Sequence, residues 1–352
     1  MSSYQENRKK YITIKTRELL KELPPFIFDF FRGIEHTSSV NTRLAYAYDI
    51  RIFFEYIHEN IDVLKEHSSI AEITLEELDR VTPRDIEMYL EHLSYYEKNL
   101  DEEHAIAYQN GQNGKARKLA SLKTLYHYFY RQERIKNNPT SIVDMPKIYE
   151  KPIVKLEIDE IAKLLDLVDS GDTLTDKQKI YHNFTKKRDL ALIAMLLGTG
   201  IRVSECVGLN LEDIDFNYNG IKITRKGGNE TIVYFSEEVE GILRDYLEER
   251  KTKECFAIDT PLFLSMQGKR ISVRSVQLLV KKYSSLVTSL KKITPHKLRA
   301  TYGTQLYQET GDIYLVADVL GHKDVNTTKK HYAKMDDERK RMAASIIKLR
   351  EI

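Results

Sequence analysis

The chain is poor in the residues and patterns that mark secreted, membrane-spanning or zinc-binding proteins. It has no tryptophan and two cysteines, Cys206 and Cys255, which stand too far apart to form a local zinc motif. Cys206 lies in an apolar segment, where a reduced thiol in an intracellular protein is the simplest interpretation. No apolar run approaches the roughly 18 residues that cross a bilayer, and the N-terminal sequence MSSYQENRKKYITIK lacks the apolar core of a secretory signal. We expect a cytoplasmic protein that binds no membrane.

The sequence also lacks two common motifs for phosphate and metal chemistry. It contains neither a GxxxxGK(S/T) loop nor a cluster of closely spaced metal ligands. We therefore predict that the protein uses no cofactor and no metal ion. With 352 residues, 41% hydrophobic and 31% charged, the chain has the composition of a globular protein large enough for two domains.

Acidic residues are missing from one long stretch and nearly missing from another, although the net charge is only +2. None occurs between Asp259 and Glu309, whereas basic residues do: Lys269, Arg270, Arg274, Lys281, Lys282, Lys291, Lys292, Lys297 and Arg299. Residues 115–136 contain seven lysines and arginines and a single acidic residue, Glu133. The shorter block alone is most simply a solvated helix face, but the acid-free stretch favours a polyanionic partner.

Patterns along the first part of the chain predict a helical domain followed by a linker. Thr82 and Pro83 have the sequence of an N-cap and a first helical residue, and residues 115–135 form an amphipathic helical pattern. Residues 100–114 are polar and predict a loop. Residues 1–145 therefore predict a small all-helical bundle. The segment 146–156 carries proline and lysine without helical periodicity and is the predicted linker.

The second domain, residues 157–352, is predicted to contain helices and one hairpin. A polar insert (170–185) precedes a strongly apolar helix (188–200). The segment IKITRKGGNETIVYF (221–235) alternates between apolar and polar residues on both sides of Gly227-Gly228-Asn229, which is typical of a β-hairpin. The predicted fold class is mainly α, with a small antiparallel sheet in an α+β second domain.

Two short segments carry residues suited to binding a phosphate. Arg202 follows the apolar helix, with Glu205 three residues later; on their own they are most simply an ion pair at a helix end. His296 and Arg299 are spaced i, i+3 at the start of a helix for which Thr294 is the predicted N-cap. One helix face would then present an imidazole and a guanidinium near the positive end of the helix dipole, an arrangement suited to a phosphate.

A third segment, LGHKDVNTTKKHY, places His322 after a Leu-Gly turn and Tyr332 ten residues later. In order and spacing, these segments and the hairpin resemble the tyrosine recombinase (phage integrase) family, most closely its Xer-type members and in particular the single-recombinase Xer branch. The resemblance covers nearly the whole chain: TRLAYAYDIRIFFEYI resembles the first long helix of the family's core-binding domain, and RDLALIAMLLGTGIRVSECVGLNLEDID the start of its catalytic domain.

The resemblance implies a role for each matching residue. The implied catalytic residues are Arg202, Lys226 in the hairpin, His296, Arg299, His322 and the nucleophile Tyr332, with Glu205 in support. Residues 1–145 would be the core-binding domain, with Arg43, Lys115, Arg117, Lys118 and Lys123 as DNA-binding residues. One position departs from the family pattern: Ala300 stands directly after the second arginine, where many members have histidine or lysine.

The activity that the resemblance implies is site-specific recombination. Duplex DNA would be cleaved and rejoined through a 3′-phosphotyrosine, with strand exchange through a Holliday junction, in chromosome-dimer resolution or in integration and excision of a mobile element. A type IB-like topoisomerase and a non-cleaving DNA-binding protein with a relic site remain as alternatives. The implied partners are a double-stranded target site and further copies of the chain, a dimer on one site and a tetramer in the synaptic complex.

The last residues, MDDERKRMAASIIKLREI (335–352), predict an amphipathic helix whose apolar face carries Met342, Ile346, Ile347 and Leu349. This helix either folds back on its own domain or, as the resemblance implies, docks on a neighbouring subunit.

Overall fold

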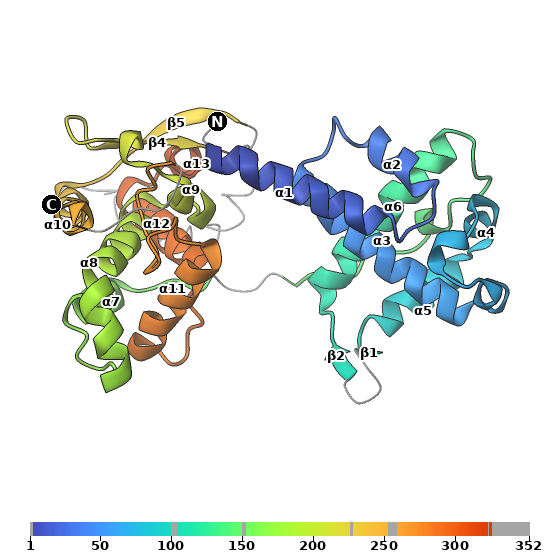
Figure 1. The fold of residues 1–352 in the computed structure, drawn as a ribbon, viewed down its shortest axis with the longest axis horizontal. Helices are drawn as coiled ribbons and strands as arrows, with labels where there is room; N and C mark the ends of the chain where they lie inside the picture. Colours follow the sequence, from blue (N-terminus) through green and yellow to red (C-terminus); the bar gives the residue numbers. More distant parts are fainter. Residues whose placement is uncertain are drawn as a thin grey trace, which may run out of the picture. The chain divides into compact units, whose positions relative to one another are not determined.

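The computed structural model describes residues 3–99, 105–149, 153–225, 228–252, 259–322 and 324–325. The chain folds into two compact units, residues 5–150 and residues 151–352 with residues 1–4 (Figure 1). The boundary between residues 150 and 151 falls within the predicted linker, and the described residues between 142 and 157 form neither helix nor strand. None of the helices in the described part of the chain is long and apolar enough to cross a membrane.

The first unit is built mainly from helices. The elements up to the linker are α1 (Ser3–Leu20), α2 (Ile27–Gly33), α3 (Val40–Asn60), the 3-10 helices η1 (Asp62–Glu66) and η2 (Ile70–Glu72), α4 (Leu75–Arg80), α5 (Pro83–His92), β1 (Tyr96–Asn99), β2 (Ala105–Tyr108), α6 (Gln112–Arg131) and η3 (Pro139–Ser141). The predicted start of α5 is confirmed, because Thr82 Oγ1 accepts a hydrogen bond from the amide of Asp85 and the Asp85 carboxylate accepts one from the amide of Thr82. Helices α3 and α6 pack against each other around a core that includes Phe53 and Phe129.

The predictions of an all-helical first unit and of a loop over residues 100–114 are wrong. Strands β1 and β2 pair in antiparallel register, with Tyr96 opposite Tyr108. The two rings stack with centroids 5.4 Å apart, and such a cross-strand aromatic pair stabilises a two-stranded sheet. Helix α6 begins at Gln112, inside the predicted loop.

The second unit combines helices with one small sheet. Its elements are α7 (Ile158–Ser170), α8 (Asp176–Thr199), α9 (Val203–Gly208), the 3-10 helix η4 (Leu211–Asp213), β3 (Ile214–Asp215), β4 (Gly220–Thr224), β5 (Glu230–Tyr234), α10 (Glu237–Lys251), α11 (Val273–Val287), α12 (Pro295–Thr310) and α13 (Ile313–Leu320). The sheet is antiparallel in the order β3-β4-β5. The predicted hairpin is confirmed by the pairing of Ile221 with Val233, and so is the fold class, mainly α with a small antiparallel sheet.

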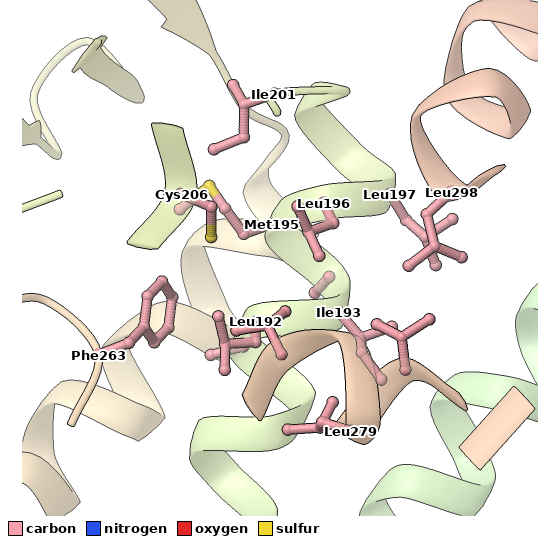
Figure 2. Packing of buried hydrophobic residues seen from close by; sticks show 14 of the residues in the cluster. Leu192, Ile193, Met195, Leu196, Leu197, Ile201, Cys206, Phe263, Leu279 and Leu298 are labelled. Atoms are coloured by element: carbon pink, nitrogen blue, oxygen red, sulfur yellow. The ribbon is translucent and has the colours of Figure 1, made fainter. Parts of the chain in front are cut away.

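Helix α8 is longer than predicted and organises the core of this unit. It begins inside the predicted polar insert, where the Thr175 side chain accepts from the Gln178 amide and the Gln178 side chain accepts from the Thr175 amide. Its apolar second half is buried. Figure 2 shows Leu192, Ile193, Met195 and Leu196 of α8 among side chains from other segments, including Phe263, Leu279 and Leu298. The buried second half of α8 therefore leads the chain to Arg202.

Candidate active site

The end of α8 sets the position of the first predicted site residue. The helix ends at Gly200, which has a left-handed conformation with φ 62°. Space also requires glycine there, because a Cβ would lie 2.4 Å from Cδ1 of Tyr302. The chain then turns, and Arg202 takes the N-cap position of α9 in an extended conformation.

Arg202 is oriented by the neighbouring carboxylate of Glu205. Nη1 of Arg202 lies 2.8 Å from Oε1 of Glu205, and the Arg202 amide donates to Oε2 at 2.8 Å. The Glu205 side chain is 6% exposed, whereas that of Arg202 is 35% exposed. The buried carboxylate therefore directs a guanidinium that still reaches solvent. Nη2 of Arg202 donates to the carbonyl of Gly321 at 3.3 Å.

Arg299 reaches the same region from α12. Its residue exposure is 4%, and a buried guanidinium needs hydrogen-bond acceptors. Nη1 donates to the carbonyl of Gly200 at 2.5 Å, and Nη2 donates to the carbonyl of Leu320. Arg299 thus links the end of α8 to the end of α13.

The first turn of α12 differs from the predicted capping. Thr294 stands at the N-cap position, but its side chain makes no capping hydrogen bond. Its carbonyl instead accepts from the amides of Lys297 and Leu298. His296 is exposed whereas Arg299 is buried, so the two residues that the i, i+3 spacing was expected to present together face different surroundings.

The C-terminal end of α13 is where the site residues meet. We call residues Val319–His322 the α13 turn. The helix ends at Gly321 (φ 64°), and the amide of His322 donates to the carbonyl of Ala317 at 2.9 Å, as in a Schellman motif. The three successive carbonyls accept hydrogen bonds from three arginines: Val319 from Arg225, Leu320 from Arg299 and Gly321 from Arg202. These carbonyls form the negative end of the helix dipole, which favours nearby cations.

Arg225 is the one member of this cluster that the sequence did not single out. It follows β4 at the start of the hairpin turn, directly before Lys226. Its Nη2 donates to the carbonyl of Val319 at 2.8 Å. Burial lowers the pKa of Arg225 below its usual value, while the nearby carboxylate of Glu205 acts in the opposite direction. The only available signal was a second basic residue in TRKGG, which is weak.

The predicted DNA-binding residues of the first unit have hydrogen-bond partners within that unit. Three donate to neighbouring oxygens: Arg43 to the carbonyl of Glu35 (2.7 Å), Lys115 to the hydroxyl of Ser94 (2.6 Å) and Lys123 to the carbonyl of Val143 (2.8 Å). These contacts engage the charged head groups of the three side chains with oxygens of their own unit.

Arg117 and Lys118 pair with Asp49, a buried carboxylate of α3. Nη1 of Arg117 lies 2.5 Å from Oδ2, and Nζ of Lys118 lies 3.5 Å from Oδ1. Lys118 is 5% exposed, which corrects the prediction that it lies on a solvated basic face of the helix. An amphipathic pattern does not distinguish a surface lysine from one drawn inward by a buried aspartate.

Three predicted features lie outside the described residues. They are the hairpin lysine Lys226, the nucleophile Tyr332 and the C-terminal segment 335–352. Their proposed roles rest on their places in the sequence.

Comparisons with known proteins place the chain in a family. The model of the Phage integrase family matches residues 156–339. Tyrosine recombinase XerC of Caldanaerobacter subterraneus subsp. tengcongensis is 31% identical over 350 residues, which cover 96% of this chain and 91% of that protein. The chain belongs to the phage integrase family. Tyrosine recombinase XerS of Lactococcus lactis subsp. cremoris (strain SK11) is 29% identical to this family member over 362 residues, covering 95% of this chain and 98% of that protein.

As a member of the phage integrase family, the protein is a site-specific tyrosine recombinase, an enzyme that breaks and rejoins DNA. A solved structure of XerH site-specific recombinase bound to a palindromic difH substrate, in a post-cleavage complex, has the same fold. Its TM-score is 0.61 at 20% identity, with 96% of this chain and 94% of that chain covered. The comparisons give no support to the topoisomerase or the non-cleaving alternative.

Proposed function

We propose that this recombinase cleaves a specific duplex site by attack of Tyr332 on the scissile phosphate and exchanges strands with a second duplex through a Holliday junction. The observation that carries the proposal is the convergence of Arg202 and Arg299 on the α13 turn. The chain reaches Tyr332 ten residues after His322 of that turn. A nucleophile that follows the phosphate-binding residues so closely suits in-line attack at the same phosphate.

The two guanidiniums suit the charge that develops during the reaction. Attack on a phosphodiester places negative charge on the non-bridging oxygens, and fixed donors stabilise it best when they need not reorganise. Arg202 and Arg299 carry a permanent charge and a planar set of N–H donors. Both are held by carbonyl or carboxylate partners before any substrate arrives, so the protein spends little free energy in ordering them.

The remaining predicted residues, His296, His322 and Lys226, would assist proton transfer and bind the phosphate. The phenol of a tyrosine has an ordinary pKa of about 10 and attacks poorly at neutral pH unless a base or a positive field assists. We assign this assistance to His296, and a hydrogen bond to a phosphate oxygen to His322. Lys226 would protonate the departing 5′-oxygen. The 3′-phosphotyrosine keeps the free energy of the broken bond, so rejoining requires no ATP.

The DNA partner and the assembly are also proposals for this chain. The XerH structure contains a difH DNA substrate, which supports duplex DNA as the substrate here and Arg43, Lys115, Arg117 and Lys123 as contacts of the first unit. A dimer on one site and a tetramer in the synaptic complex would follow from exchange between two duplexes. Relatives named XerC and XerS match over more than nine-tenths of their lengths. We propose chromosome-dimer resolution, the role that the Xer-type resemblance implies, rather than mobile-element integration. Chromosomal DNA as the substrate would place the protein in the cytoplasm.

Trapping of the covalent intermediate tests the nucleophile. On a nicked duplex from which the short fragment bearing the released 5′-hydroxyl can dissociate, the protein should form an adduct that survives denaturation. Tyr332→Phe removes one hydroxyl and should abolish the adduct while DNA binding stays close to the wild-type value. Tyr314→Phe, at a tyrosine 70% exposed on α13, is the control and should form the adduct normally. An adduct in the Tyr332→Phe protein would show that another residue attacks.

Strand exchange is tested separately from cleavage. Two duplexes that carry the target site should give Holliday junctions and then recombinant products. Adduct formation and relaxation of supercoils without any junction would contradict the proposed exchange while leaving the nucleophile intact.

A further inference from the structure

Arg225 ties the small sheet to the α13 turn. Its amide donates to the carbonyl of Asn229 at 2.8 Å, and its carbonyl accepts from the amide of Gly228 at 3.0 Å, so its backbone is fixed across the hairpin. Its side chain reaches the first carbonyl of the α13 turn, where Nη2 donates to the carbonyl of Val319 at 2.8 Å. The contact joins residues 94 positions apart in the sequence.

Burial of the Arg225 side chain costs free energy, because part of its guanidinium lacks hydrogen-bond acceptors in the part of the chain that the structure describes. Nε and Nη1 of Arg225 are buried and have no hydrogen-bond partner among the described residues. Buried donors without acceptors destabilise a fold, and such groups persist mainly where another requirement holds them in place. The adjoining glycine shows how closely the group is packed: a Cβ on Gly321 would lie 1.2 Å from Nη1 of Arg225. Burial of these atoms argues against a direct contact with substrate.

Arg225 reaches the α13 turn from a different part of the fold than Arg202 and Arg299 do. Arg202 lies at the start of α9 and Arg299 on α12, whereas Arg225 directly follows β4, at the start of the hairpin turn. The carbonyls of Leu320 and Gly321 accept hydrogen bonds from the two guanidiniums assigned to the phosphate. The neighbouring carbonyl of the same turn, that of Val319, accepts one from Arg225. A turn that orients other groups must itself be fixed, and the hydrogen bond from Arg225 supplies that restraint.

We propose that Arg225 is a positioning residue for the reaction: by holding Val319, it fixes the α13 turn and thereby the placement of Arg202 and Arg299 against the scissile phosphate. This inference rests on the proposed function. It predicts a defect that depends on the negative charge of the phosphate, because only the fit of the two phosphate-binding guanidiniums is disturbed.

The test compares two nicked substrates that differ by one atom group. One has the natural phosphodiester at the scissile position, and the other has a methylphosphonate, in which a methyl group replaces a charged non-bridging oxygen. Attack on the methylphosphonate builds one negative charge fewer and depends less on well-placed guanidiniums. The protein variants are Arg225→Met, which keeps an unbranched apolar stem without donors, and Lys222→Met as the matched control. Lys222 lies on the same strand, is 55% exposed and pairs with Glu230 at 3.1 Å.

On the phosphodiester, Arg225→Met should form the adduct about 10- to 100-fold more slowly than wild type, the loss expected for one hydrogen bond from a charged donor. On the methylphosphonate its rate should stay close to wild type. Lys222→Met should match wild type on both substrates. Arg225→Lys keeps a charge and a donor, and it should show a smaller loss with the same dependence on the phosphate charge; it carries the comparison if the methionine variant does not fold.

Two results would overturn the inference: a normal rate of Arg225→Met on the phosphodiester, or equal losses on both substrates, which would indicate a general lesion of the fold. Failure of the wild-type protein to form any adduct on the phosphodiester would instead refute the proposed function. The two failures are therefore distinguishable.

Discussion

Arg299 holds together two chain segments that are distant in sequence. Its two terminal nitrogens donate to the carbonyls of Gly200 and Leu320, 99 and 21 positions away. A lysine ammonium is a compact point charge and cannot span both acceptors in the way that a planar guanidinium does. The role of Arg299 therefore depends on the geometry of its head group as well as on its charge.

The substitution Arg299→Lys separates these two properties. It keeps the charge but should slow adduct formation by about 10²- to 10³-fold, the range for loss of one fixed donor at a developing anion. Affinity for a half-site should change little, since the residue is 4% exposed. Arg244→Lys, at an arginine 55% exposed on α10, is the matched control and should react normally. Full adduct formation by Arg299→Lys would refute the need for a bidentate group.

Gly321 is required by the α13 turn for two separate reasons. Its φ of 64° lies in the left-handed region, and Nη1 of Arg225 occupies the space that a Cβ would take. Gly321→Ala should lower the free energy of unfolding by about 1–2 kcal/mol for the backbone conformation and should also displace Arg225, which slows adduct formation. Gly311→Ala, at the C-cap of α12 with φ 70°, has the same backbone cost. If both variants lose adduct formation equally when compared by kinetics and urea unfolding, the contact with Arg225 is irrelevant to the reaction.

Sequence order singled out Arg202 and Arg299 as site residues but not Arg225. Motif spacing records which residues lie near one another along the chain, and HxxR or RVSE can be recognised in that way. The role proposed for Arg225 rests on a hydrogen bond to Val319 across the fold, which no local pattern encodes. The burial of Lys118 escaped prediction for the same reason, because its partner Asp49 lies on another helix.

At the scale of helices and strands, the sequence predicts best where apolar periodicity is strong. The capped start of α5, the apolar part of α8 and the β4-β5 hairpin were all predicted. Helix α1 was not, because the polar Thr16 lies on its buried face between Ile12 and Leu19, whereas the apolar Tyr11 and Ile14 are exposed. Strands β1 and β2 are only four residues long, β1 carries two charged residues, and the stacking of Tyr96 on Tyr108 joins residues that no alternating pattern marks.

Helices α3 and α6 are joined by a buried charge cluster whose energetics can be tested. Burial raises the pKa of Asp49 and lowers that of Lys118, each opposed by the charge of the partner. Removal of one member leaves the other charge buried without a counterion. Asp49→Ala should therefore lower the free energy of unfolding of the protein by about 3–5 kcal/mol, as is typical for a broken buried pair.

The double variant Asp49→Leu/Lys118→Met should recover much of that loss, because both charges are replaced by apolar groups. Asp62→Ala removes an aspartate that pairs with Lys65 at 2.7 Å but is 94% exposed, and it should leave unfolding almost unchanged. Urea unfolding followed by near-UV circular dichroism provides the comparison. A double variant as unstable as Asp49→Ala would show that the pair itself stabilises the packing of α3 on α6.

At the scale of the whole molecule, the distribution of charge along the sequence differs from its distribution in the folded protein. The stretch between Asp259 and Glu309 contains no acidic residue, yet Arg270 pairs with Asp259 at 2.5 Å and Lys291 with Glu160 of α7 at 2.5 Å. Folding brings carboxylates from elsewhere against part of the basic block. A prediction of DNA contact from sequence charge alone therefore overstates the number of cations available to phosphates.

Assembly of several protomers on DNA is a property of the whole molecule. We predict that the C-terminal segment 335–352 mediates it. Recombination between two duplexes requires several protomers, and an amphipathic helix with Met342, Ile346, Ile347 and Leu349 on one face suits docking on a neighbour. Each such side chain contributes about 1.5–3 kcal/mol when buried, so loss of the segment should reduce cooperative filling of the second half-site by more than about ten-fold.

Truncation after Lys340 should preserve binding of one protomer to one half-site. It should also abolish strand exchange, because an unanchored segment no longer sets the position of Tyr332. Lys348→Ala, on the polar face of the same segment, serves as the control and should bind and recombine normally in gel-shift and recombination assays. Cooperative filling and normal recombination by the truncated protein would show that the segment packs on its own subunit.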